Sequence, residues 1–156
     1  MYSQTDLDIL LKQENDLRYD SFTCEDAFQL GIETIECAKH YDRGIVVRIT
    51  RELDSLVLFQ SVMEEKAERN FTFAEMKHTS VLKHHHSSAY VYVISQMEEG
   101  YEQTSAGAFP IFLKDGTHVA TIMVSGLHEG KDHTVIIEAL QNKLHISTAQ
   151  FTNKLL

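Results

Sequence analysis

The stretch FPIFLKDGTHVATIMV, residues 109–124, decides the fold. Apolar runs at Phe109–Leu113 and His118–Val124 flank the polar segment Lys114–Thr117, whose Asp-Gly pair is a strong signal for a tight turn. Pro110, the only proline, lies near the start of the first run, where a strand tolerates a residue without a backbone donor. The stretch therefore predicts a β-hairpin.

A second hairpin is predicted in the first half of the chain. Ile45–Thr50 and Leu56–Phe59 have the composition of strands, and the residues between them are polar. Apolar residues at helical spacing predict three further helices, and these cover residues Thr5–Lys12, Phe73–Lys83 and Lys131–His145. On the helix over residues 73–83, one face carries Phe73, Met76 and Ser80.

The best-defined helix follows Thr23, which is a suitable N-cap with Asp26 three residues later. Its apolar residues form one broad stripe that we expect to face the core. The stripe consists of Cys24, Phe28, Gly31, Ile35 and Ala38, widened by Ala27, Leu30, Thr34 and Cys37. Both cysteines should then be inert, and roughly 20 Å of helix keeps them from pairing with each other.

These elements predict an α+β protein with an antiparallel sheet, since hairpins separated by helices do not form alternating βαβ units. Ala89–Ile94 scores as a strand by propensity, although a short apolar run also suits a buried helix. The length of 156 residues predicts a single domain over 1–156, with a mobile polar tail at 146–156.

Composition excludes several classes of partner. The net charge is −9, which argues against a surface that neutralises nucleic-acid phosphates or binds an anionic membrane. We see neither an N-terminal targeting signal nor an apolar run of membrane-spanning length. With two unpaired cysteines, the expected location is the cytoplasm.

Recognisable catalytic motifs are absent, and the consecutive histidines His84, His85 and His86 are the first feature to weigh. Neighbouring helical residues point about 100° apart, so three in a row cannot chelate one metal ion. We therefore expect a solvated cluster at a helix end and assign no metal site. There is also no Gly-x-Ser-x-Gly nucleophile turn and no phosphate-binding loop.

Two segments with small residues are better candidates for a ligand site. Ser105–Pro110 contains Gly107, Phe109 and Pro110, and Val124–Leu127 contains Ser125 and Gly126 just before the last helix. Small residues let the backbone approach a ligand, and free backbone donors at a helix start can hold a carboxylate or phosphate. These glycines could equally serve turns alone.

Asp132 and His133 follow at the start of that last helix. They could form an acid–base or metal-binding pair. The alternative is a capping aspartate beside a surface histidine.

At these residues the chain resembles the haem-degrading-domain family, which groups GlcG-like and HbpS-like proteins with the C-terminal domain of PduO-type proteins. It is most similar to a branch of short bacterial and fungal members. The resemblance covers about residues 22–140. It is carried by Gly107–Ile111, Val124–Leu127, Asp132-His133, Val135–Leu140, and Lys77 followed by Ser87-Ser88.

The resemblance implies a profilin-like antiparallel sheet with helices on both sides and a helix at Ala89–Ile94. It also implies homo-oligomers, octamers or decamers, and haem or another tetrapyrrole as a possible ligand. The cofactor itself stays open, and no histidine is singled out as an axial ligand.

Three functions remain. The first is an oligomeric protein that binds a small anionic or tetrapyrrole-like ligand near Ser125, Gly126 and the last helix, with Lys77 as counter-charge. The second is a structural or chaperone-associated assembly. The third is an enzyme that uses Lys77, Asp132 and His133 as acid–base groups.

Overall fold

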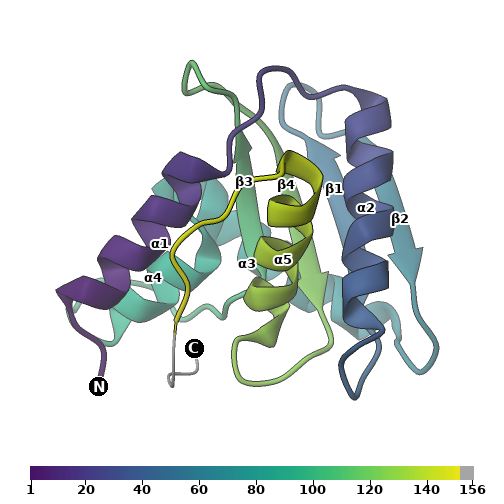
Figure 1. Cartoon of the computed structure of the whole chain (residues 1–156). Helices are drawn as coiled ribbons and strands as arrows, with labels where there is room; N and C mark the ends of the chain where they lie inside the picture. Colours follow the sequence, from purple (N-terminus) through teal and green to yellow (C-terminus); the bar gives the residue numbers. More distant parts are fainter. Residues whose placement is uncertain (152–156) are drawn as a thin grey trace.

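The computed structural model describes residues 1–151, and within them five helices alternate with two hairpins (Figure 1). The elements run in the order α1 (Gln4–Asp16), α2 (Cys24–Ala38), β1 (Val46–Arg51), β2 (Val57–Val62), α3 (Glu68–His84), α4 (Ser88–Ser95), β3 (Ala108–Phe112), β4 (His118–Ser125) and α5 (Lys131–Leu144).

The four strands form one antiparallel sheet in the order β2-β1-β4-β3. Both predicted hairpins are confirmed, and β1 pairs with β4 to join them. At the turn between β3 and β4, the Gly116 N–H donates to the Leu113 carbonyl over 2.9 Å. The Thr117 N–H donates to the Asp115 carboxylate, as expected for the Asp-Gly signal.

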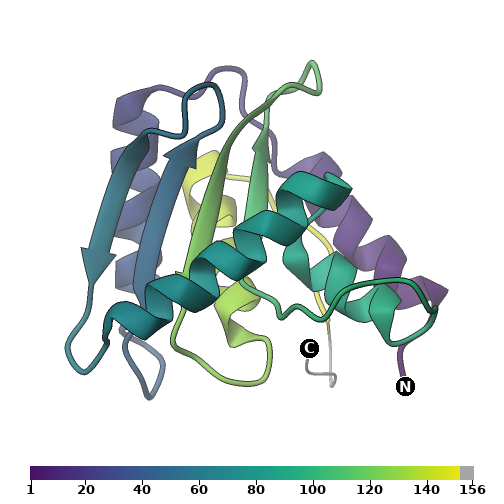
Figure 2. The ribbon, with the colours of Figure 1, turned by 180° about the vertical axis from the view of Figure 1, so that it is seen from behind.

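Helices cover both faces of the sheet, so the predicted α+β class with helices on both sides is confirmed (Figures 1 and 2). Helices α2 and α5 lie side by side on one face, whereas α3 crosses the other face and α4 follows it. The main core lies between the sheet and the α2–α5 layer, where Phe109, Ile122 and Leu140 are fully buried. Helix α1 packs against α4 at the β3 side.

Helix α2 begins as the sequence predicts, since Thr23 and Asp26 exchange hydrogen bonds in a capping box. Its buried stripe, however, is narrower than expected. Cys37 is buried, but Cys24 is exposed and Phe28 is 49% exposed. The expectation that both cysteines face the core was therefore wrong for Cys24, because the helix turns that edge of the stripe away from the sheet.

The segment Ala89–Ile94 is helical in α4, so its strand propensity was misleading and the resemblance was right. Buried contacts with α1 and α3 outweigh the preference of β-branched residues. On α3, the residues that pack inward include Ala74, Lys77 and Val81, whereas Phe73 and Met76 are half exposed.

Residues 146–151 lie beside α1, where the Gln13 amide donates to the Ala149 carbonyl over 2.9 Å and the Thr148 hydroxyl donates to Asp16. The rest of the predicted mobile tail, residues 152–156, lies outside the described residues.

Candidate functional site

Three of the predicted site residues meet at one end of the sheet. The Lys77 ammonium on α3 donates to the Asp132 carboxylate on α5 over 2.9 Å and to the Val124 carbonyl at the same distance. Gly107 lies directly against this ion pair. A Cβ atom at Gly107 would stand 2.7 Å from Lys77 Nζ and 2.6 Å from the Val124 carbonyl oxygen, and its φ of +134° disfavours any other residue.

This ion pair joins the helix layers on the two faces of the sheet. Both side chains are almost fully buried, at 4% and 8% exposed. The second Asp132 oxygen accepts from the Leu127 N–H over 2.8 Å, so the carboxylate also fixes the loop before α5. A buried pair of this kind is expensive to break from one side only, because the remaining charge stays buried. Lys77 and Asp132 therefore neutralise each other.

His133 of α5 and Phe109 of β3 meet inside the main core, on the face of the sheet that α2 and α5 cover. Their rings are 6.0 Å apart, and His133 Nε2 bonds the Gln13 side-chain oxygen on α1 over 2.7 Å. His133 is buried, not a surface histidine, and its Nδ1 has no hydrogen-bond partner within the described residues. Burial lowers the pKa of His133 to about 3, so the ring is neutral at physiological pH.

The remaining predicted residues line the sheet end and the β3 edge. Ser125 is buried at the end of β4 opposite Val46. At Gly126, the carbonyl accepts from Lys66 over 3.1 Å, and a Cβ would stand 2.5 Å from the Gly44 carbonyl oxygen. Pro110 pairs with Thr121 across the ladder. Gly126 thus serves close backbone packing.

The three consecutive histidines have separate environments. His84 bonds Glu102 over 2.9 Å, and His86 bonds Glu14 of α1 over 2.9 Å. Only His85 is exposed, and it ends α3 in the left-handed conformation. The cluster is therefore not simply solvated. In residues 1–151, no group of three or more His, Cys, Asp or Glu side chains is placed to hold a metal ion.

A polar network beneath α3 was missed by the sequence reasoning. Glu52 accepts from His78 and from the Thr121 hydroxyl, each over 2.9 Å, and His118 bonds the same hydroxyl. Burial raises the pKa of Glu52, but the hydrogen bonds from His78 and Thr121 outweigh it and the net pKa is lowered. Burial lowers the pKa of His78, and the bond to Glu52 reverses that effect. No spacing in the sequence connects these residues, because they come from separate elements.

A small hollow lies between α3 and the segment that leads into β3. It has a volume of about 180 Å³ and is lined by Phe73, Met76, Lys77, Gln103, Thr104 and Ser105. The Thr104 hydroxyl oxygen is buried and has no hydrogen-bond partner among the described residues. A larger, open hollow of about 660 Å³ lies on the other side of Met76, beside β2. Lys77 is the only predicted site residue that lines the small hollow.

The sequence of residues 22–141 matches the family described as haem degrading protein HbpS-like. The chain belongs to this family. A UPF0303 protein of Psychromonas ingrahamii is 30% identical over 151 residues, covering 90% of this chain and 94% of the relative. A UPF0303 protein of Rhizobium rhizogenes is 28% identical, with 90% and 91% covered.

The fold of this HbpS-like chain is shared with solved structures. The crystal structure of the Ybr137w protein superposes with a TM-score of 0.80 at 23% identity and covers 90% of this chain and 89% of its own. The PduOC:heme complex gives a TM-score of 0.62 at 16% identity and covers 83% and 99%. At these identities the likeness establishes the shared architecture. In residues 1–151, no helix has the length and apolar character that crossing a membrane requires.

Proposed function

We propose that this HbpS-like protein is a homo-oligomer that binds a ligand with a flat apolar body and carboxylate groups, of the tetrapyrrole class. The family description and the heme complex of the PduOC relative support the ligand class. The proposed binding surface is the small hollow beside Met76 together with the exposed face of α3.

The proposal rests on the Thr104 hydroxyl, which has no hydrogen-bond partner in residues 1–151. A buried polar group without a partner costs about 1–3 kcal/mol, and a bound carboxylate would accept the missing hydrogen bond once the Thr104 side chain turns its hydroxyl into the hollow. Phe73 and Met76, 50% and 56% exposed, lie over the same hollow and supply an apolar surface. A polar group that lacks a partner thus lies next to apolar side chains that water contacts, an arrangement that a ligand of this class would satisfy.

In this proposal the ligand carboxylates bind at Gln103, Thr104 and Ser105, and Ser125 and Gly126 do not contact them. The Gly126 carbonyl already accepts from Lys66, and the Leu127 N–H already donates to Asp132. Lys77 lines the small hollow, but its charge is neutralised by Asp132.

A tetrapyrrole fits this surface only in part. The small hollow is below the roughly 300–1,000 Å³ of typical ligand pockets, so it takes one edge of the ring system and the rest extends over Met76. No histidine lines the small hollow, and the Met76 thioether is the lining side chain suited to haem iron. When bound, haem would supply its own iron chemistry, and this chain would supply binding and orientation.

Titration with haemin tests the proposal. We expect a Soret shift that saturates at a fixed ratio of haemin to protein. Thr104→Val removes one hydrogen bond of about 0.5–1.5 kcal/mol, which should weaken binding roughly 2- to 13-fold. Met76→Ala should weaken binding and also change the Soret position if the sulfur contacts iron.

The matched control is Met97→Ala, since Met97 is also exposed but does not line the small hollow. It should bind haemin like the unaltered protein. An absent Soret shift at stoichiometric haemin, or equal losses in Met76→Ala and Met97→Ala, would refute the proposed binding surface.

A further inference from the structure

The two edges of the sheet differ in how they are protected. Along β3, the Tyr19 N–H donates to the Phe112 carbonyl over 3.0 Å, and the Lys114 N–H donates to the Tyr19 carbonyl over 2.9 Å. Pro110 also lacks a donor on that strand. At the other edge, β2 pairs with β1 alone, and no described segment covers its outer side. Proteins normally block such an edge with proline, lysine or a covering segment.

The backbone of β2 offers a regular row of free donors and acceptors. The Met63 N–H donates to the Ile45 carbonyl over 3.0 Å. Hydrogen-bonded residues alternate along an antiparallel strand, so the backbone N–H and C=O groups of Ser61 and Phe59 also point towards β1. The N–H and C=O groups of Gln60 and Val62 therefore point away from β1. A bulge interrupts the register only near Val57, so residues 59–62 remain regular.

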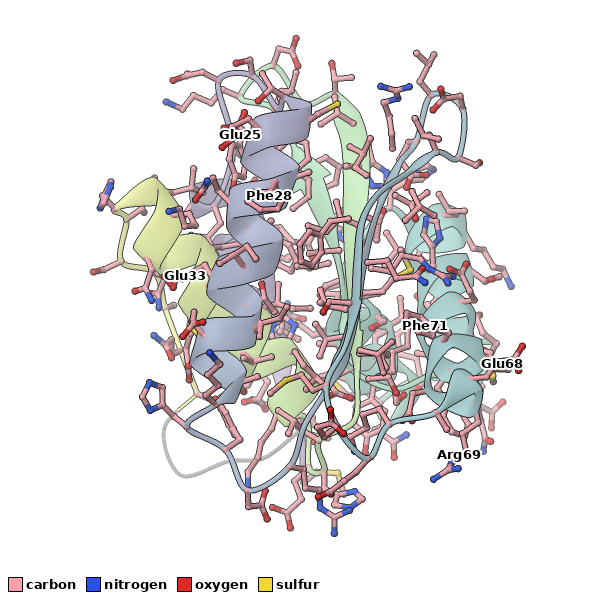
Figure 3. The ribbon with its side chains drawn as sticks, turned by 90° about the vertical axis from the view of Figure 1, so that its right-hand side faces the viewer. Glu25, Phe28, Glu33, Glu68, Arg69 and Phe71 are labelled. Carbon is pink, nitrogen blue, oxygen red and sulfur yellow. The ribbon has the colours of Figure 1, made fainter. Side chains whose placement is uncertain are left out.

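The side chains of β2 are uncharged, and apolar residues lie on the α2 side of this edge. On the α3 side, Arg48, Glu68 and Glu75 line the open hollow that Gln60 also lines. Figure 3 looks onto β2, with Phe28 of α2 on one side of the strand and Phe71 of α3 on the other. Phe28 and Ile32, 49% and 40% exposed, continue the apolar surface along α2, while Glu33 lies farther from the strand. Strand β2 itself has the sequence VLFQSV, without a charge.

We propose that a second copy of this chain docks on β2, so that the two β2 strands pair antiparallel about a two-fold axis near Gln60. The inference rests on the self-association in the proposed function and assigns the surface for it. Each Gln60 would exchange two backbone hydrogen bonds with its counterpart, and the two sheets would become continuous. The axis makes the contact closed and self-complementary, as in most homodimers.

Two features favour a second copy over another occupant. Each copy has a net charge of −9, so copies repel least where they meet through uncharged residues. Strand β2 carries no charge, although Glu25 and Glu33 flank the apolar side chains of α2. The exposed apolar residues of α2 also lie close to the proposed two-fold axis. Phe59 packs under Phe28, with ring centroids 6.1 Å apart, and touches Gly31. The axis that pairs Gln60 with its counterpart would therefore also bring Phe28 and Ile32 against the second α2.

Light scattering and hydrogen exchange on the full chain test this assignment. We expect the unaltered protein to have an even number of subunits and slow exchange of the Gln60 and Val62 amides, whose N–H groups point away from β1. Val62→Lys and Ile32→Lys, which place charges at the edge, should at least halve the mass and speed that exchange. Denaturation midpoints should confirm that both variants remain folded. The matched control is Leu82→Lys, because Leu82 is 45% exposed on α3 away from β2.

The outcomes separate this inference from the proposed function. An oligomer whose mass is unchanged by both edge variants refutes the β2 assignment while self-association stands. A monomeric unaltered protein refutes both statements about assembly. Rapid exchange of the Gln60 and Val62 amides in an intact oligomer also overturns the assignment. Haemin titration of the dissociated variants reports on the small hollow independently.

Discussion

At position 133, burial determines the protonation state of the imidazole and the way in which its contribution to stability depends on pH. His133 is 2% exposed, and desolvation lowers its pKa in the folded chain to about 3. In the unfolded chain a histidine titrates near the ordinary value of about 6.5. As the pH falls below that value, the unfolded chain takes up a proton that the folded chain does not. The contribution to stability is therefore complete above about pH 6.5 and decreases towards about pH 3.

Replacing His133 by glutamine should remove this part of the pH dependence. Between about pH 7 and about pH 4.5, we expect the unaltered protein to lose roughly 2–3 kcal/mol more unfolding free energy than His133→Gln. Urea denaturation of both proteins across this range measures the difference, and the carboxylates common to both cancel in it. Parallel stability curves would contradict the assignment of a buried neutral imidazole.

At the scale of elements, the fold is held together by contacts between helices on opposite faces of the sheet. Lys77 on α3 reaches past the end of β4 to Asp132 on α5, and Gly107 leaves the space for it. The ion pair thus links α3 on one face of the sheet to α5 on the other.

Removing one partner of the Lys77–Asp132 ion pair should destabilise the fold strongly. We expect Lys77→Met to lose about 3–5 kcal/mol of unfolding free energy, because the Asp132 carboxylate stays buried without its counter-charge. The double variant Lys77→Met with Asp132→Asn should recover part of the loss. Denaturation midpoints of the single and double variants measure both effects. A loss below about 1 kcal/mol in the single variant would show that water reaches the carboxylate.

Local signals in the sequence predicted the elements better than they predicted which faces are buried. The Asp115-Gly116 turn and the Thr23 capping box act over a few residues, and both hold in the structure. Ala89–Ile94 was ambiguous because its conformation depends on packing against α1, which is distant in sequence. For the site, the sequence identified Lys77, Gly107 and Asp132 as candidate residues. It did not reveal that Lys77 and Asp132 neutralise each other, nor that the Thr104 hydroxyl has no hydrogen-bond partner among the described residues.

At the scale of the whole molecule, the charge of −9 opposes assembly while the uncharged β2 edge favours it. Copies that meet at β2 bring their acidic surfaces closer, and dissolved salt screens the repulsion. The Debye length falls from about 30 Å at 0.01 M to about 8 Å at 0.15 M ionic strength.

Self-association should therefore strengthen as salt is added. We expect the dissociation constant to fall between low and physiological ionic strength, and sedimentation equilibrium at both conditions measures it. If salt instead weakened the association, ion pairs would hold the interface, and an uncharged strand edge would be the wrong surface.

The position of α1 has a practical consequence for such measurements. Helix α1 and residues 146–151 lie at the β3 side of the molecule, whereas β2 forms the opposite side (Figure 1). A protein anchored to a sensor chip through its N-terminus would thus present β2 to the flowing solution. Immobilised and free molecules could then meet without the linker standing between them.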